Sequence, residues 1–257
     1  LAARRDPERT SQDWDHLAMQ EPDPIKRARI YEEALRALPE SASMAAYAAV
    51  FFETSSATVE QAEDLHLRAV GLAGSDAGVL TNYANFLTDI RRDHDSAEAL
   101  YQRAFEADPN RVNTLGNYAN FLRRVRQDLN GAEALYRRVL DIDPNRASTL
   151  GNYALLLADD RLDYDAAEAL FARALEIDPN HANHLSNYAR FLAGIRQDYA
   201  AADALYKRAL EAAPSDARRL RDYEEFLASV PEPGTTMGGA FKSARKIDPA
   251  DDSDFGF

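Results

Sequence analysis

The sequence predicts an all-α solenoid, a superhelix of about seven helical hairpins. The main observation is that the chain superposes on itself when it is shifted by thirty-five residues. This shift aligns a tyrosine series and a proline series: Tyr83, Tyr118, Tyr153, Tyr188 and Tyr223, and Pro109, Pro144, Pro179 and Pro214. The second observation is composition, because alanine, leucine, glutamate and arginine are abundant while glycine is sparse before the C-terminal tail. A period of 20 to 50 residues is typical of a repeat array. The length of 257 residues therefore reflects how many repeats the chain contains and does not indicate a number of globular domains.

The N-terminal segment, residues 1–24, is predicted to be the divergent first helix of the first hairpin. Trp14, Leu17 and Ala18 have helical spacing, and Pro22 and Pro24 end the helix. The repeat array follows over residues 25–229. Its first helix, residues 25–38, stands two periods before the matching helix that ends at Pro109, and is therefore the second half of a repeat.

The array continues with a degenerate hairpin over residues 43–73, where Ala48 replaces the tyrosine and Gly74 replaces the proline. Four well-formed units come next, at residues 76–109, 111–144, 146–179 and 181–214, and a last first-half helix covers 217–229. Within a unit the apolar residues of the first helix are spaced i, i+3, i+4 and i+7, which places them on one face. That face and the small alanines of the second helix are expected to form the core between neighbouring hairpins.

The joints carry residues that favour helix ends. Asp95 with Glu98, Asn130 with Glu133, and Asp165 with Glu168 predict capping boxes for the second helices. A further series after the prolines is expected to begin the first helices: Asn110, Asn145, Asn180 and Ser215. Arginines at a third set of joints are expected to stabilise helix C-termini: Arg91, Arg126, Arg161 and Arg196.

The C-terminal segment changes character after Val230, where Pro and Gly disfavour a helix. The period still continues, because Phe241, Ala244 and Pro249 stand one period after Tyr206, Ala209 and Pro214. We therefore predict a weak capping helix within residues 230–249. Residues 250–257 form an acidic tail with two phenylalanines, which we expect to be flexible and hypothesise to mediate self-association.

The repeated pattern resembles the tetratricopeptide repeat family. One helix carries Leu-x-x-Tyr-Ala-x-x-Leu and the next carries Ala-x-x-Leu-Tyr-x-x-Ala-Leu-x-x-x-Pro, over about residues 25–229. The usual tetratricopeptide repeat has 34 residues, so the additional residue of each unit is expected in the turn between its helices. The N-terminal part, with Asp13-Trp14 and Ala28-Arg29-Ile30-Tyr31, also looks like the half-a-tetratricopeptide repeats of RNA-processing scaffolds.

The resemblance implies a protein-binding module whose first helices line a concave groove. Opposite the core, each first helix carries a polar stripe, and Asn82, Asn117, Asn152 and Asn187 recur on it once per repeat. In the family, asparagines at this place often grip the backbone of an extended peptide, since an amide offers both a donor and an acceptor. Ser148 and Asn183 belong to the same stripes. The predicted peptide-binding residues are Asn82, Asn85, Asn113, Asn117, Asn120, Arg124, Asn152, Asn187 and Arg190.

Several classes of partner are disfavoured. The formal charge of −13 disfavours a nucleic-acid surface. The sequence has no cysteine, no signal-peptide pattern and no apolar run near eighteen residues, which leads us to expect a cytoplasmic protein without a membrane span. Its first residue is leucine, so the chain is read as a segment or a processed product.

Catalysis finds little support in the sequence, and neither a cofactor nor a metal is predicted. There is no Gly-rich phosphate loop and no nucleophile motif. His181 and His184 share a helical face without a third ligand and are interpreted as surface residues. The predicted function is a non-enzymatic module that binds an extended peptide. Two alternatives stay open: a scaffold of an RNA-processing complex, and a regulatory repeat domain of a larger enzyme.

Overall fold

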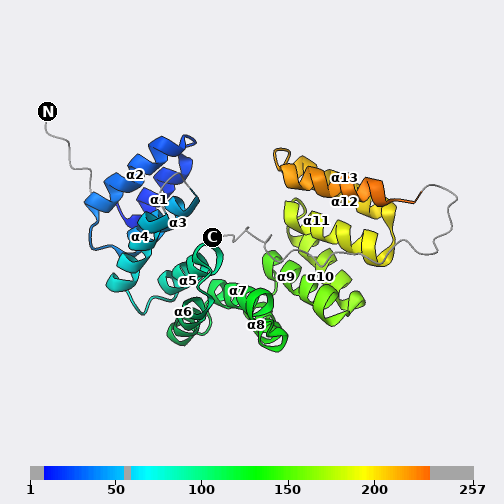
Figure 1. Ribbon diagram of the computed structural model, residues 1–257, viewed down its shortest axis with the longest axis horizontal. Helices are drawn as coiled ribbons and strands as arrows, with labels where there is room; N and C mark the ends of the chain where they lie inside the picture. The colour runs from blue at the N-terminus through cyan, green and yellow to red at the C-terminus, as the bar shows by residue number, and fades with distance from the viewer. Residues whose placement is uncertain (1–8, 55–58, 232–257) are drawn as a thin grey trace. The chain divides into compact units, whose positions relative to one another are not determined.

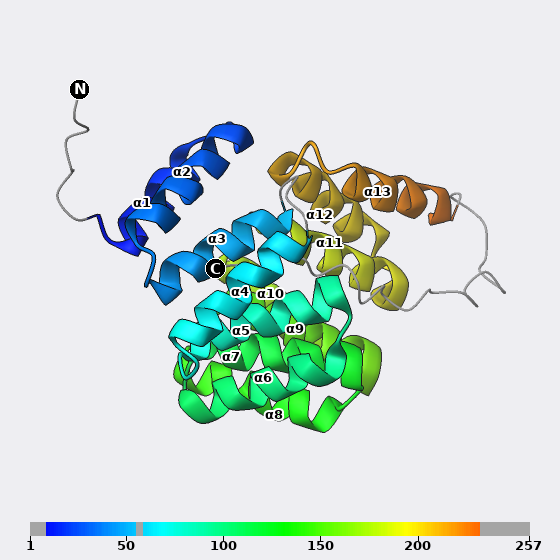
Figure 2. The same ribbon diagram turned by 60° about the vertical axis from the view of Figure 1, so that its left-hand side comes forward.

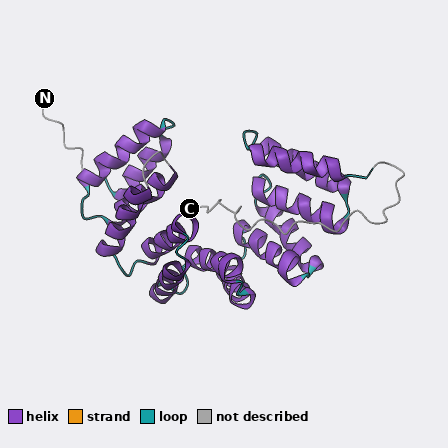
Figure 3. Ribbon diagram, viewed as in Figure 1, coloured by secondary structure: helices purple, strands orange, loops and turns teal. Residues whose placement is uncertain are grey.

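The computed structural model describes residues 9–54 and 59–231, and in these ranges the chain is all-α (Figure 3). It contains thirteen α-helices, some of which continue into a π-helical turn, and no strand within the described ranges. The prediction of an all-α fold is confirmed. The helices form six consecutive hairpins followed by the single helix α13.

The chain divides into two compact units at Tyr118 and Ala119, near the end of helix α7. In the first unit, each helix from α1 to α5 packs on the next helix in the chain, and α1 and α5 also contact α3. The helices are α1 (Ser11–Gln20), α2 (Pro24–Ala37), α3 (Ala42–Thr54), α4 (Val59–Leu72), α5 (Ala77–Phe86), η1 (Leu87–Arg91), α6 (His94–Ala107) and most of α7 (Val112–Phe121).

The second unit repeats the same arrangement, and Figures 1 and 2 both show its hairpins side by side. Helices α9 and α10 pack together, α11 packs on α10 and on α12, and α9 and α11 also touch. The helices are the end of α7, η2 (Leu122–Arg126), α8 (Leu129–Ile142), α9 (Ala147–Leu155), η3 (Leu156–Arg161), α10 (Tyr164–Ile177), α11 (Ala182–Phe191), η4 (Leu192–Arg196), α12 (Tyr199–Ala212) and α13 (Ala217–Ser229).

The core consists of alanines that allow close helix contact and of aromatic rings that join successive hairpins. Ala132, Ala167 and Ala202, the first buried alanines of α8, α10 and α12, are fully buried. The ring of Tyr153 stacks on Tyr136 with centroids 5.9 Å apart, and Tyr188 stacks on Phe171 at 5.5 Å. The recurring tyrosines are therefore packing residues, as expected from their places in the pattern.

The 35-residue period is explained by the ends of the first helices. Helices α5, α7, α9 and α11 each pass into the π-helical segments η1 to η4. The next residue is left-handed in all four: Arg92 (φ 58°), Gln127 (57°), Leu162 (59°) and Gln197 (58°). A π-helical turn accommodates one more residue than an α-helical turn. The additional residue of each unit is thus in the last turn of the first helix. The sequence predicted it one step later, in the turn between the two helices.

The predicted capping boxes of the second helices are wrong in register. Asp128, Asp163 and Asp198 are the N-caps of α8, α10 and α12, and their side chains accept from the amides of Gly131, Ala166 and Ala201. These aspartates follow the left-handed residues directly, so the helices begin two residues earlier than predicted. The predicted caps instead lie inside the first turn, as the range of α10, Tyr164–Ile177, shows for Asp165.

The first helices begin later than predicted. Asn145 and Asn180 lie in turns, and the N-caps of α9 and α11 are Arg146 and His181. The predicted arginines at helix C-termini do lie at the ends of the π-helical turns. They also reach back to the preceding hairpin: Arg196 pairs with Glu168 at 2.6 Å and with Asp165 at 2.5 Å.

Two predictions concern residues outside the described ranges, namely the capping helix over 237–247 and the acidic tail over 250–257.

Candidate functional site

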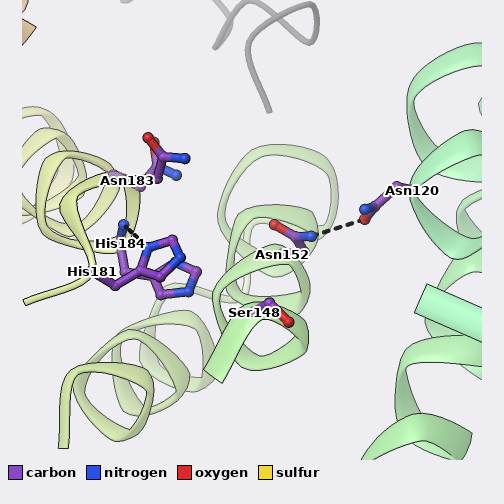
Figure 4. Close-up of a pocket in the computed structure, with 7 residues that line it drawn as sticks. Asn120, Ser148, Asn152, His181, Asn183 and His184 are labelled. Atoms are coloured by element: carbon purple, nitrogen blue, oxygen red, sulfur yellow. Dashed lines mark hydrogen bonds between the residues drawn. The ribbon is translucent and has the colours of Figure 1, made fainter. Parts of the chain in front are cut away.

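The second unit contains a polar depression between its first helices (Figure 4). Its empty space, counted together with open solvent at its mouth, is about 340 Å³. Such an open space suits a side chain or a peptide segment better than an enclosed small molecule. Its lining is Asn120, Ser148, Asn152, His181, Asn183, His184 and Asn187.

The depression is formed by equivalent positions of successive repeats. Ser148 and Asn152 lie one turn apart on α9, and Asn183 and Asn187 occupy the same two places on α11, thirty-five residues later. Because residues four apart share a helix face, each helix presents two polar side chains to the same side. The predicted recurrence of polar residues therefore places four lining residues together.

Asn152 is held by the preceding repeat. Its side-chain nitrogen donates to Oδ1 of Asn120 at 3.0 Å, a bond drawn in Figure 4. The same oxygen accepts from the hydroxyl of Tyr136 at 2.5 Å. Since the Nδ2 group of Asn152 is engaged with Asn120, its carbonyl oxygen Oδ1 is outside this bond and provides an acceptor.

Asn187 is oriented in the opposite sense. Its Oδ1 accepts from Arg190 Nη2 at 2.9 Å, which leaves the NH₂ group outside this bond as a donor. Asn183 is similarly oriented, because its Oδ1 accepts from Arg219 at 2.5 Å. Arg219 is itself buried and pairs with Asp216 at 2.9 Å, so this arrangement is built into the packing of α13 on α11.

The depression is neutral, because amides, a hydroxyl and two imidazoles line it and no carboxylate or ammonium does. Burial, with a smaller effect of His181, lowers the pKa of His184 to about 3, and so this imidazole is neutral near pH 7. Two arginines, Arg190 and Arg219, donate to the amide oxygens of Asn187 and Asn183. A donor and an acceptor on neighbouring repeats, without net charge, match the C=O and N–H groups of a polypeptide backbone.

The interpretation of His181 and His184 as surface residues is wrong for His184, which is 4% exposed. Its ring stacks on His181 with centroids 3.8 Å apart. A Cβ atom at Gly151 would collide with the His184 ring. The sequence signal for this burial is Gly151, because a residue without a side chain leaves room for the His184 ring. The next repeat has Ser186 at the equivalent position.

Other predicted site residues lie outside the depression. Asn85 is buried in the first unit and accepts from the Tyr101 hydroxyl at 2.6 Å, so its oxygen serves packing. Asn120 does line the depression, but its oxygen has the same packing role toward Tyr136, and the residue is 9% exposed. Asn113 is exposed, and the remaining residues are partly buried: Asn82, Asn117, Arg124 and Arg190.

No group of three or more potential metal ligands lies together within residues 9–54 and 59–231. No helix in the same ranges is long and apolar enough to cross a bilayer.

Comparison with known proteins identifies the repeat. Residues 148–181, which include three of the seven residues that line the depression, match the tetratricopeptide repeat family. No curated protein sequence matches the chain.

Solved structures share the fold over most of the chain. PilF of Pseudomonas aeruginosa is 21% identical, with a TM-score of 0.63, covering 85% of this chain and 96% of its own. PilW, described as a type IV pilus biogenesis factor, is 17% identical with a TM-score of 0.67, covering 86% of this chain and 99% of its own. A chain of the APC/C hetero-tetramer Cut9–Hcn1 is 14% identical with a TM-score of 0.70, covering 87% of this chain and 44% of its own. The resemblance expected from the sequence is thus confirmed: the chain contains a tetratricopeptide repeat and has the all-α solenoid fold of tetratricopeptide-repeat proteins.

Proposed function

We propose that this protein is a non-enzymatic interaction module that binds an extended segment of a partner protein at the depression of its second unit. The tetratricopeptide fold supports a role as a protein-interaction scaffold. The observation that carries the finer proposal is the fixed orientation of two amides: Asn120 engages the nitrogen of Asn152, and Arg190 engages the oxygen of Asn187.

This orientation favours backbone recognition. The partner's N–H would donate to Asn152 Oδ1, and a partner C=O would accept from Asn187 Nδ2. Because both amides are held before binding, the partner does not need to order them, and less entropy is lost. An extended strand has its N–H and C=O groups free of internal hydrogen bonds, unlike a helix, and is therefore the conformation that such a pair can bind.

The test uses a peptide selected against the 257-residue chain from a random 12-residue display library. We expect the double substitution Asn152→Ala and Asn187→Ala to weaken binding of that peptide by about 1 to 3 kcal/mol, because two net hydrogen bonds of about 0.5 to 1.5 kcal/mol each are lost. Isothermal titration calorimetry would measure a roughly 5- to 150-fold rise in Kd. Circular dichroism would check that helicity is unchanged.

A matched control is Asn145→Ala with Asn180→Ala, since both asparagines are exposed in the turns before α9 and α11. This control should bind like the parent. Equal affinity of the site variant and the parent would overturn the proposal and would instead favour a scaffold that works through other helix faces. N-methylation of individual peptide amides should weaken binding at one or two positions if the backbone is recognised.

A further inference from the structure

The imidazole of His184 is a buried polar group that the proposed hydrogen bonds to the partner's backbone do not use. The residue lines the depression and is 4% exposed. Its Nε2 atom is enclosed and has no hydrogen-bond partner among the described residues. Because most buried polar side-chain atoms are hydrogen-bonded, this exception points to a group that reaches the ring from outside the chain.

Equivalent side chains in other repeats do have partners. The His184 ring lies against Gly151, which stands thirty-three residues earlier, on the preceding first helix. Two other pairs at this separation are hydrogen-bonded: the hydroxyls of Thr81 and Thr114 at 2.8 Å, and Arg219 Nη1 with the hydroxyl of Ser186 at 3.3 Å. Glycine has no side chain that could bond to the imidazole in this way. The pair of Gly151 and His184 therefore leaves hydrogen-bonding capacity unused at the wall of the depression.

Contacts on two sides hold the ring in place. It stacks on the ring of His181 with centroids 3.8 Å apart, as Figure 4 shows, and its other contact is the backbone of Gly151. A half-turn about the Cβ–Cγ bond keeps the ring in the same space and exchanges its nitrogens with carbons. The imidazole can therefore turn a nitrogen toward the depression without leaving the stack.

The charge of the site selects the kind of group that can bond to this ring. Burial lowers the pKa of His184 to about 3, so the imidazole is neutral near pH 7, with one nitrogen that donates and one that accepts. A hydroxyl suits either nitrogen, because it can rotate to donate or to accept. A charged side chain would be desolvated without an opposite charge, since the lining contains neither a carboxylate nor a cationic side chain.

We propose that the depression recognises a serine or threonine of the partner segment, whose hydroxyl forms a hydrogen bond with the imidazole of His184. This inference rests on the proposed function, because it requires a partner segment in the depression. Backbone bonds to Asn152 and Asn187 would accept many sequences, whereas this bond would select one class of side chain. A site that bonds a hydroxyl disfavours the analogue without it, since its own polar group is then left unpaired.

The test compares threonine with valine, which has nearly the same shape but no hydroxyl. Peptides are selected from the random 12-residue library against the 257-residue chain, and a serine or threonine position that they share is synthesised with each residue. In isothermal titration calorimetry we expect valine to raise Kd about tenfold. With the variant His184→Val the two peptides should bind within about twofold of each other. Val79, the equivalent residue three repeats earlier, is 5% exposed, so valine is compatible with this position, and circular dichroism checks the fold.

The control His16→Gln, at an exposed position of α1, should keep the tenfold difference. Selected peptides that share no serine or threonine, or equal Kd values of the two peptides for the parent, would overturn the proposal. A difference that persists in His184→Val would also overturn it, by assigning the hydroxyl to another side chain.

The variant with Asn152→Ala and Asn187→Ala separates this inference from the proposed function. It should weaken the threonine and valine peptides equally and keep their ratio. Unchanged affinities with the ratio retained would overturn the backbone bonds alone and support the bond to His184. Weakened affinities with a ratio of one in the parent would support the backbone bonds and overturn the bond to His184.

Discussion

Position 120 carries an asparagine, while the equivalent position of the next repeat, 155, carries a leucine. The aromatic residue sixteen positions later changes in parallel: Tyr136 follows Asn120, and Phe171 follows Leu155. In the first case the tyrosine hydroxyl donates to the asparagine, and in the second both residues are buried and apolar. In these two repeats the buried hydroxyl and its acceptor are thus present together or absent together.

A double-mutant cycle tests this coupling. Asn120→Leu alone should reduce the free energy of unfolding by about 1 to 3 kcal/mol, because the Tyr136 hydroxyl is left buried without an acceptor. Adding Tyr136→Phe recreates the pair found at 155 and 171 and should recover most of that loss. Urea denaturation monitored by circular dichroism measures both values. A double variant as unstable as the single variant would contradict the coupling.

His184 should make stability depend on pH. Burial lowers its pKa in the folded chain to about 3, below its ordinary value of 6.5. Between these values the unfolded chain binds more protons than the folded chain, so stability falls as the pH falls. Relative to His184→Thr, the parent should lose up to about 1.4 kcal/mol for each pH unit between pH 6 and 4. Urea titrations at several pH values measure this difference, and His16→Gln, at an exposed position of α1, serves as the control. Parallel curves for the parent and His184→Thr would contradict the pKa assignment.

At the scale of the element, the connection from first to second helix is the most regular feature of the fold. A π-helical turn, a left-handed residue and an aspartate N-cap follow one another four times. None of the four left-handed residues is glycine. A non-glycine residue in this conformation costs roughly 1 to 2 kcal/mol, so the connection is retained at some expense in stability.

Leu162 offers the clearest test of that cost, because it is left-handed and 62% exposed. We expect Leu162→Gly to stabilise the protein by about 0.5 to 1 kcal/mol, since glycine adopts positive φ without the Cβ clash. Leu67→Gly is the matched control, as Leu67 is 51% exposed within α4 and should lose about 1 kcal/mol of stability on substitution. Thermal unfolding compares the two variants. A similar loss in both would show that the left-handed conformation carries no strain.

The elements also show what could be read from the sequence. The period, the order of helices and the packing role of the tyrosines were predictable, because core spacing repeats in every unit. The caps were predicted two residues late, since a π-helical turn moves the helix start and has no simple residue signature. The packing role of the asparagines at 85 and 120 was not predicted, because spacing alone does not show a hydrogen bond to a tyrosine sixteen residues away. His184 was assigned to the surface because its space is created by Gly151 on another helix.

At the scale of the molecule, the chain is acidic overall, with a formal charge of −13, yet the depression is lined by neutral side chains. Binding that depends on backbone hydrogen bonds should therefore depend less on salt than binding to a charged groove. We expect the amides of Asn152 and Asn187 to contact the partner.

The measurement that tests this claim most directly is nuclear magnetic resonance of the asparagine side-chain amides during titration with the selected peptide. We expect the NH₂ resonances of Asn187 and Asn152 to shift in proportion to binding, while those of Asn145 and Asn180 in the turns do not. Saturated binding that leaves both site resonances unmoved would contradict it.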